Sequence, residues 1–217
     1  MTRATQLTKV NRVRYTDMTQ GRIYLLRHGE TEWSLTGRHT SYTDLSLIEQ
    51  GRRGAASAGE LLTDVRGPDA PPFVLALCSP RRRATETAEL AGLSPTIDER
   101  LVEWNYGEYE GLTTPEIRKT VPGWLLWNDP TPGGETAEQV AARADGVLAD
   151  CRAELDKGDV VLIGHGHFSR VITARWLGLP ASAGIGFKLD AGGLNVLGDE
   201  RGEPRLDHVN LIEVGKV

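Results

Sequence analysis

Short apolar runs alternate along this chain with longer segments of helical periodicity, and this alternation constrains the fold more than any other feature. The apolar runs are RIYLL (22–26), FVLAL (73–77), DVVLI (159–163) and LNVLG (194–198). The helical segments that we expect between them are 48–65, 80–91, 134–157 and 167–178. Apolar runs of this length suit strands that are buried on both faces of a parallel sheet. We therefore predict an α/β fold, a three-layer α/β/α sandwich with a mostly parallel central sheet.

The length of 217 residues suits one compact domain with a sizeable core. We assign residues 21–217 to this domain. Residues 1–20 lack the continuous apolar stretch of a secretory signal, and we interpret them as a flexible N-terminal tail. Met18 lies just before the first predicted strand, so translation that starts there is an alternative, and the intact mass of the native protein would test it.

The composition excludes several classes of function. The chain has 25 Lys and Arg residues against 30 Asp and Glu residues, a net charge of −5, so it lacks the basic field that wraps nucleic acid. No apolar run approaches the roughly 20 residues that span a bilayer. Cys78 and Cys151 are too few for a disulfide framework. We therefore expect a cytoplasmic protein that binds neither nucleic acid nor membrane, and the sequence leaves open whether it forms a homodimer.

Three of the predicted strands end in residues that carry chemistry. The first is followed by RHG (27–29), the second by SPRRR (79–83) and the third by HGH (165–167). The carboxyl ends of parallel strands share one edge of a sheet, and open α/β sheets bind their ligands there. We therefore expect these three segments to meet in one site.

His28 is a candidate nucleophile in this set. The guanidinium of Arg27 disfavours protonation of a neighbouring imidazole, and the same cation holds an incoming dianion against it. Taken alone, the tripeptide is explained equally well by a half-buried histidine that bonds to the backbone.

The segment 78–90 places three arginines where a helix begins. We expect Ser79 to cap this helix and Pro80 to occupy its first turn. Consecutive helical side chains point in different directions, so at most one or two of the arginines can face the strand edge. An arginine in the first turn adds a bidentate phosphate ligand to the anion-binding N–H groups of a helix N-terminus.

Glu103 and the histidine pair complete the candidates. Glu103 lies among Trp104, Tyr106 and Tyr109, and a carboxyl that loses solvation against aromatic rings is a candidate proton donor. The alternative is an ordinary surface glutamate beside core aromatics. The two histidines of 165–167 have a spacing that also occurs in zinc sites, but no further ligand follows closely, and we therefore disfavour a metal.

Four segments together resemble the histidine phosphatase superfamily, also called phosphoglycerate mutase-like. They are RHGETEWSLTGRHTSYTDLSLIEQG (27–51), SPRRRATETA (79–88), LVEWNYGEYEG (101–111) and GHGHFSR (164–170). The four segments occur in the same order as the motifs of the family. Together they indicate the family far more specifically than any one segment does. The resemblance is to the phosphatase branch, which includes actinobacterial-type acid phosphatases and fungal sedoheptulose-bisphosphatase.

The resemblance implies a role for each matching residue. His28 would be the nucleophile that accepts the phosphoryl group, and Glu103 would be the general acid. The phosphate pocket would consist of Arg27, Arg83 and His165, where Arg83 is the arginine that matches the family's spacing from Ser79. The substrate side would include Arg38, Thr40 and Ser34. Ser34 and Ser41 stand where the family commonly has asparagine and glycine.

The implied activity is that of a phosphomonoesterase of the acid phosphatase type, without metal or cofactor. It would act through a phosphohistidine on small phosphorylated metabolites such as sugar phosphates. A phosphoglycerate mutase and a non-catalytic module that binds phospho-ligands are the alternatives. Trp104 follows Glu103 where mutases that use 2,3-bisphosphoglycerate usually have arginine, and only 62 positions separate Glu103 from His165, which leaves little room for a lid. We therefore favour the phosphatase.

Overall fold

A mixed six-stranded sheet forms the centre of the computed structural model, which describes residues 21–212; the predicted tail at 1–20 lies outside this range. The strands are β1 (Ile23–Arg27), β2 (Leu75–Cys78), β3 (Thr96–Ile97), β4 (Val160–Gly164), β5 (Leu194–Glu200) and β6 (Glu203–Leu211). Their order is β3-β2-β4-β1-β5-β6. The pairs β1–β4, β2–β4 and β2–β3 are parallel, whereas β5 is antiparallel to both β1 and β6. The predicted α/β fold with a mostly parallel sheet is confirmed.

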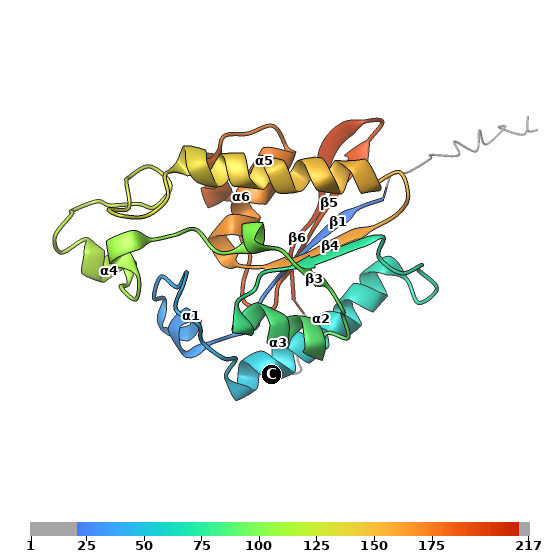
Figure 1. Ribbon diagram of the computed structural model, residues 1–217, viewed down its shortest axis with the longest axis horizontal. Helices are drawn as coiled ribbons and strands as arrows, with labels where there is room; N and C mark the ends of the chain where they lie inside the picture. The colour runs from blue at the N-terminus through green and yellow to red at the C-terminus, as the bar shows by residue number, and fades with distance from the viewer. Residues whose placement is uncertain (1–20, 213–217) are drawn as a thin grey trace, which may run out of the picture.

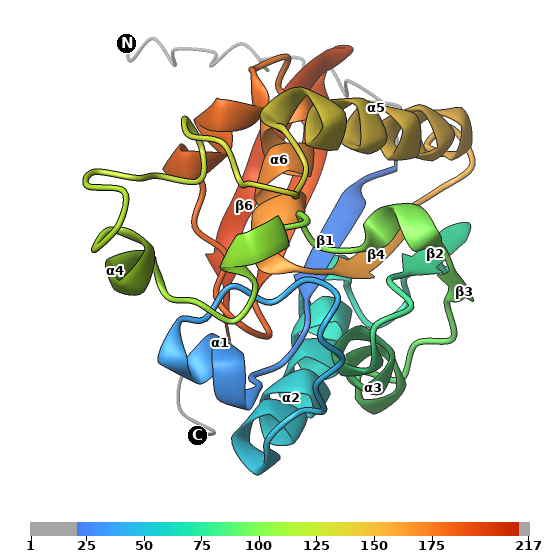
Figure 2. The same ribbon diagram turned by 60° about the vertical axis from the view of Figure 1, so that its left-hand side comes forward.

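Helices cover both faces of this sheet. The helices are α1 (Glu32–Thr36), α2 (Glu49–Arg66), α3 (Arg82–Leu90), α4 (Thr114–Ile117), α5 (Ala137–Glu154) and α6 (Gly166–Trp176), with short 3₁₀ helices η1 (Glu99–Leu101), η2 (Gly107–Tyr109) and η3 (Ala181–Gly186). Helices α5 and α6 lie on one face, and α2 and α3 lie on the other (Figure 1). Figure 2 shows α1 near the end of β1 and α4 farther out, on the left of the molecule. This arrangement is the predicted three-layer sandwich.

The apolar run of β1 explains why two helical layers are needed. Ile23 and Leu25 belong to the core cluster on the side of α5 and α6, and Tyr24 and Leu26 belong to the cluster on the side of α2 and α3. All four side chains are at most 1% exposed. Successive side chains of a strand point to opposite faces, so an unbroken apolar run is stable only where both faces are covered.

Two strands were not predicted, and each lacks an apolar run. Strand β3 has two residues, both exposed, and β6 is largely exposed on the edge of the sheet. Strands β5 and β6 are joined by a tight turn at Arg201 and Gly202, whose φ angles of 59° and 87° are left-handed. A two-residue hairpin turn with positive φ at both residues matches the right-handed twist of the two strands that it joins.

The predicted cap of α3 is wrong. This helix begins at Arg82, with Arg81 at the N-cap position and no side-chain capping bond. The hydroxyl of Ser79 instead lies 2.7 Å from Nε2 of His165, across the gap between two strand ends. The same hydroxyl also accepts from the N–H of Arg81 at 3.4 Å, before the helix begins. Ser79 thus becomes part of the site, and the helix starts at Arg82, two residues after the predicted start at Pro80.

Candidate active site

The ends of β1 and β4 lie side by side and bring two histidines together. Arg27 and Gly164 are paired in the parallel register of these strands, and the N–H of His28 donates to the carbonyl oxygen of Gly164 at 2.9 Å. The rings of His28 and His165 follow directly, with their centroids 5.2 Å apart. The predicted meeting of these strand ends at one edge of the sheet is confirmed.

A pocket of about 250 Å³ opens at this edge. Six of the eight residues proposed from the sequence line it, namely Arg27, His28, Ser34, Arg38, Thr40 and Glu103. The other two, Arg83 and His165, lie behind His28 and are 0% exposed. The lining also contains five polar side chains that the phosphate chemistry did not assign, namely His39, Tyr106, Thr114, His167 and Arg170.

His28 is held as a neutral imidazole with one defined lone pair. Its Nδ1 lies 2.7 Å from the carbonyl oxygen of Gly29. Because a carbonyl can only accept, Nδ1 carries the proton and Nε2 carries the lone pair. Burial, with the cations Arg83 and Arg27, lowers the pKa of His28 well below its usual value of 6.5. A neutral Nε2 is the form that attacks an electrophile.

The glycine after His28 is required by packing. The N–H of Gly29 donates to Oγ1 of Thr87 at 2.9 Å, which ties the loop to α3. A Cβ at Gly29 would overlap the carbonyl oxygen of Gly51 in the first turn of α2. The nucleophile loop and α2 therefore approach each other as closely as backbone allows.

Arg27 presents a hydrogen-bond donor beside His28. Its Nη1 donates to the carbonyl oxygen of Leu189 at 2.8 Å, which fixes the guanidinium, while its buried Nε has no hydrogen-bond partner within residues 21–212. Burial lowers the pKa of Arg27, and the carboxylate of Glu103 opposes this shift. A fixed, desolvated guanidinium with an unused N–H matches a phosphoryl oxygen.

Arg83 and His165 form a hydrogen-bonded group directly behind His28. Arg83 Nε donates to Nδ1 of His165 at 3.3 Å, and its terminal nitrogens donate to the carbonyl oxygens of Thr40, Ser41 and Thr43. These bonds use four of the five N–H groups of the guanidinium, so one N–H group remains available for a ligand. Burial, with Arg83, keeps the pKa of His165 well below its usual value, so this imidazole is neutral.

Glu103 is held at the N-terminus of α6. Its Oε1 accepts from the backbone N–H groups of Trp104 (2.8 Å) and Phe168 (2.7 Å), and its Oε2 accepts from that of His167 (2.9 Å). His167 and Phe168 are in the first turn of the helix, whose free N–H groups favour a negative charge. The aromatic residues named in the sequence argument are therefore only part of the surroundings of Glu103. Oε2 keeps one lone pair for a proton.

The three residues of the predicted substrate side differ in how their side chains are used. Nη1 of Arg38 donates to the carbonyl oxygen of Gly111 and lies 3.6 Å from the carboxylate of Glu116. The hydroxyl of Thr40 donates to the carbonyl oxygen of Arg38. Ser34 forms the capping box of α1 with Thr31. Its hydroxyl is thus bonded within α1, although Ser34 lines the pocket.

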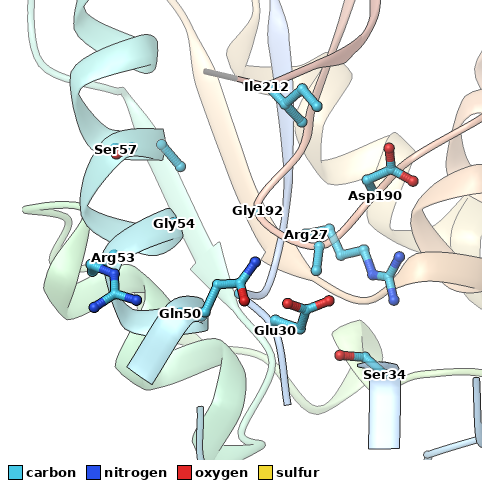
Figure 3. Close-up of a pocket in the computed structure, with 14 residues that line it drawn as sticks. Arg27, Glu30, Ser34, Gln50, Arg53, Gly54, Ser57, Asp190, Gly192 and Ile212 are labelled. Carbon is cyan, nitrogen blue, oxygen red and sulfur yellow. The ribbon is translucent and has the colours of Figure 1, made fainter. Parts of the chain in front are cut away.

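A second pocket of about 340 Å³ lies on the other side of Arg27 and Ser34. Figure 3 shows Gln50, Arg53, Gly54 and Ser57 of α2 on one side of it, with Asp190 and Gly192 opposite. It shares Arg27 and Ser34 with the smaller pocket, but neither His28 nor Glu103 lines it. The chemistry of the site therefore belongs to the smaller pocket.

The two histidines that were weighed as zinc ligands are bonded elsewhere. His165 bonds to Arg83 and Ser79, and Nδ1 of His167 lies 2.6 Å from the hydroxyl of Tyr106. Within residues 21–212, no group of three or more His, Cys, Asp and Glu side chains has the arrangement of a metal site. None of the helices in that part of the chain is long and apolar enough to cross a bilayer.

This fold and site define a class of phosphoryl-transfer enzyme, and sequence comparison agrees. The chain belongs to the histidine phosphatase superfamily (branch 1), whose family model matches residues 23–212. It is 45% identical to an acid phosphatase of Mycobacterium tuberculosis over 88% of this chain and 92% of that protein. It is 32% identical to a sedoheptulose 1,7-bisphosphatase of Saccharomyces cerevisiae over 73% of this chain and 68% of that protein. The resemblance stated from the four motifs is confirmed.

Solved structures and more distant relatives agree with the family. The structure of an open reading frame product of Mycobacterium tuberculosis matches with a TM-score of 0.85 and 42% identity, over 88% of this chain and 98% of that one. Relatives named phosphoglycerate mutases also match, at 30% to 34% identity.

Proposed function

We propose that this histidine phosphatase hydrolyses small phosphorylated metabolites, with sugar phosphates as the favoured class, through a phosphohistidine on His28. The observation that carries the proposal is that a neutral imidazole with a defined lone pair and a buried carboxyl, Glu103, line one pocket. The names of two relatives, an acid phosphatase and a sugar bisphosphatase, support the substrate class.

In the first step, Nε2 of His28 attacks phosphorus while the bond from phosphorus to the ester oxygen breaks. The leaving alkoxide takes the proton of Glu103, so an alcohol departs and a phosphohistidine remains. The unused N–H of Arg27 stabilises the phosphoryl oxygens. Arg83 has one N–H left for them, and His165 would exchange Ser79 for a phosphoryl oxygen.

In the second step, water attacks the same phosphorus and the bond to Nε2 breaks. Glu103, now ionised, accepts the proton of the water, so inorganic phosphate leaves and both residues return to their starting forms. The N–H groups at the start of α6 stabilise the carboxylate during this interval. The fixed guanidinium groups supply the positive charge that a metal ion supplies in other phosphatases.

The mutase alternative differs in what happens to the phosphohistidine. A mutase must keep the released phosphoglycerate in place and exclude water while it reorients, which requires additional cations and a lid. Two of the outer cations are already bonded, Arg38 to Gly111 and Glu116, and Arg170 to the carbonyl oxygens of Gly184 and Ile185. We therefore expect water to intercept the intermediate.

Phosphate release from a panel of sugar phosphates, phosphoglycerates and aryl phosphates tests the proposal, with an enolase-coupled assay run in parallel. The expected result is phosphate release that persists in EDTA, with little conversion of 3-phosphoglycerate to 2-phosphoglycerate. Mutase turnover well above phosphate release, stimulated by bisphosphoglycerate, would reject it. Binding of phosphate esters without turnover would instead support the non-catalytic module.

A further inference from the structure

One wall of the pocket is built from three polar side chains that the reaction above does not use. They are His39, Tyr106 and His167, which we call the neutral wall. The hydroxyl of Tyr106 lies 2.6 Å from Nδ1 of His167, and the rings of His39 and Tyr106 are 4.7 Å apart. The wall is rigid because Trp124 packs on His39 and Trp127 packs on His167.

These side chains carry no charge at neutral pH. Burial lowers the pKa of His39 to about 4. Burial, with the positive charge of Arg170, lowers the pKa of His167 well below its usual value. Burial, with the negative charge of Glu103, raises the pKa of the Tyr106 hydroxyl well above 10. A second anionic group on a substrate would therefore gain little attraction from this wall.

The hydrogen bonding of the wall favours a hydroxyl group. If the Tyr106 hydroxyl donates to Nδ1 of His167, then Nε2 carries the proton and donates; if it accepts, Nε2 accepts. In both cases Nε2 has no partner within residues 21–212, and His167 lines the pocket. A hydroxyl matches either form because it both donates and accepts.

Two cations that line the pocket beside this wall, Arg170 and Arg38, already have hydrogen-bond partners. The guanidinium of Arg170 donates to the carbonyl oxygens of Gly184 and Ile185 at 3.0 Å each and stacks 4.6 Å from the ring centroid of Trp127. Arg38 has Glu116 as a partner at 3.6 Å. A second phosphate would have to share the charge of these groups with their present partners, whereas a hydroxyl binds to His167 and leaves both sets of bonds in place.

We propose that His167, oriented by Tyr106, binds a hydroxyl group on the carbon chain of the substrate, so that the enzyme selects phosphate esters of polyols and sugars over esters of unsubstituted alcohols. This inference rests on the proposed phosphatase function. It makes His167 a specificity-determining residue and Tyr106 a positioning residue.

The first test compares two three-carbon esters, glycerol 1-phosphate and propyl phosphate. Both have poor alkoxide leaving groups and both depend on Glu103, so the comparison isolates the hydroxyl groups. We expect kcat/KM to be about 10-fold higher for glycerol 1-phosphate, since an analogue that lacks a hydroxyl leaves Nε2 of His167 without this partner in the complex. Equal values for the two esters would overturn the inference. So would a preference for propane-1,3-diyl bisphosphate over glycerol 1-phosphate, because this bisphosphate has a second anion and no hydroxyl.

Substitutions in the neutral wall test whether it causes the preference for glycerol 1-phosphate. Tyr106→Phe removes one oxygen and frees the ring of His167, so the ratio of the two kcat/KM values should fall by about 3- to 10-fold, mainly through KM for glycerol 1-phosphate. His167→Gln should lower the ratio as well. Tyr109→Phe is the matched control, since Tyr109 packs on Trp124 in the same loop without lining the pocket, and it should keep the ratio of the wild type.

Different results would reject the phosphatase function and the hydroxyl-binding role of the neutral wall. Hydrolysis of p-nitrophenyl phosphate, which lacks aliphatic hydroxyls, reports the phosphatase function and the folding of each variant. Hydrolysis of this ester with no difference between the two three-carbon esters would reject the neutral wall alone, and a ratio that survives both Tyr106→Phe and His167→Gln would do the same. No turnover of any ester by the wild type would reject the function on which the inference rests.

Discussion

The backbone N–H of His167 donates to Oε2 of Glu103 at 2.9 Å, while the imidazole of His167 lines the same pocket. The proposed proton donor and the proposed hydroxyl-binding wall are thus fixed to one helix start. A shift of α6 would move both, so the leaving oxygen and the carbon chain attached to it are positioned together.

Glu103→Gln should lower kcat more for esters with poor leaving groups than for esters with good ones. The variant cannot donate the carboxyl proton, and its amide places an NH₂ group against the N–H of His167 or those of Trp104 and Phe168. Loss of a general acid costs about 10²- to 10⁴-fold. We expect a loss of that size for alkyl phosphates and a much smaller one for p-nitrophenyl phosphate, measured as kcat. Equal losses on both esters would show that Glu103 is not the acid.

His28→Ala should lower turnover by several orders of magnitude, because the proposed intermediate forms on His28. Labelled substrate, quenched without acid, should leave an alkali-stable and acid-labile phosphoenzyme on the wild type and none on this variant. Label on serine, or activity that EDTA abolishes and zinc restores, would contradict the assignment.

The acid limb of the pH profile should lie below pH 6.5. His28 must be neutral to attack, and its pKa is lowered by burial first and by Arg83 and Arg27 in addition. Activity should therefore persist as the pH falls through 6.5 and be lost only well below it. Arg83→Gln removes one of these cations and should move the limb of kcat/KM to higher pH. Arg82→Gln, an exposed neighbour paired with Glu86, is the control and should leave the limb unchanged.

Stability should fall as the pH drops below 6.5. The folded-state pKa of His39 is about 4, so between these values the unfolded chain binds a proton that the folded chain does not. His39 alone contributes a slope of about 1.4 kcal/mol per pH unit in this window. Urea unfolding at pH 7.5, 6 and 5 measures it. His39→Gln should reduce the slope by about this amount, whereas His208→Gln, at an exposed position, should not change it.

Two glycines of α2 form a matched pair. Gly54→Ala meets no atom within 4 Å and should stabilise the helix by about 1 kcal/mol. Gly51→Ala would overlap the backbone of Glu30, in the loop after His28, and should destabilise the protein by about 1–3 kcal/mol while it lowers kcat. Thermal unfolding and phosphate release measure both effects. Similar stabilisation by the two variants would show that the nucleophile loop does not depend on this contact.

The positions of His28 and His165 could be predicted from the sequence, because strand periodicity shows where each strand ends. Apolar runs that end in His28 and His165 place both at one sheet edge once the strands are parallel. The bond between Ser79 and His165 could not be predicted, since a serine before a proline has the same sequence signal whether it caps a helix or faces a site.

The neutral wall was missed for a different reason. His39 lies in an irregular segment whose position depends on the backbone bond from its N–H to Leu112, a contact far along the chain. His167 had a usable signal, because the residue two positions after a strand-end histidine falls in the first turn of the next helix. From the sequence, His167 was interpreted only as a possible metal ligand. The antiparallel β6 carries no apolar run, so pattern alone does not distinguish it from a loop.

Because His28 directly follows β1, its position depends on the stability of the whole sheet. Strand β1 lies between β4 and β5, and the amide protons of Arg27 and His28 are bonded to Gly193 and Gly164. Such protons exchange with solvent only through the slowest, global opening of a domain. Fraying of the surface loops therefore leaves His28 in register, and we expect its position to be lost only when the sheet itself separates.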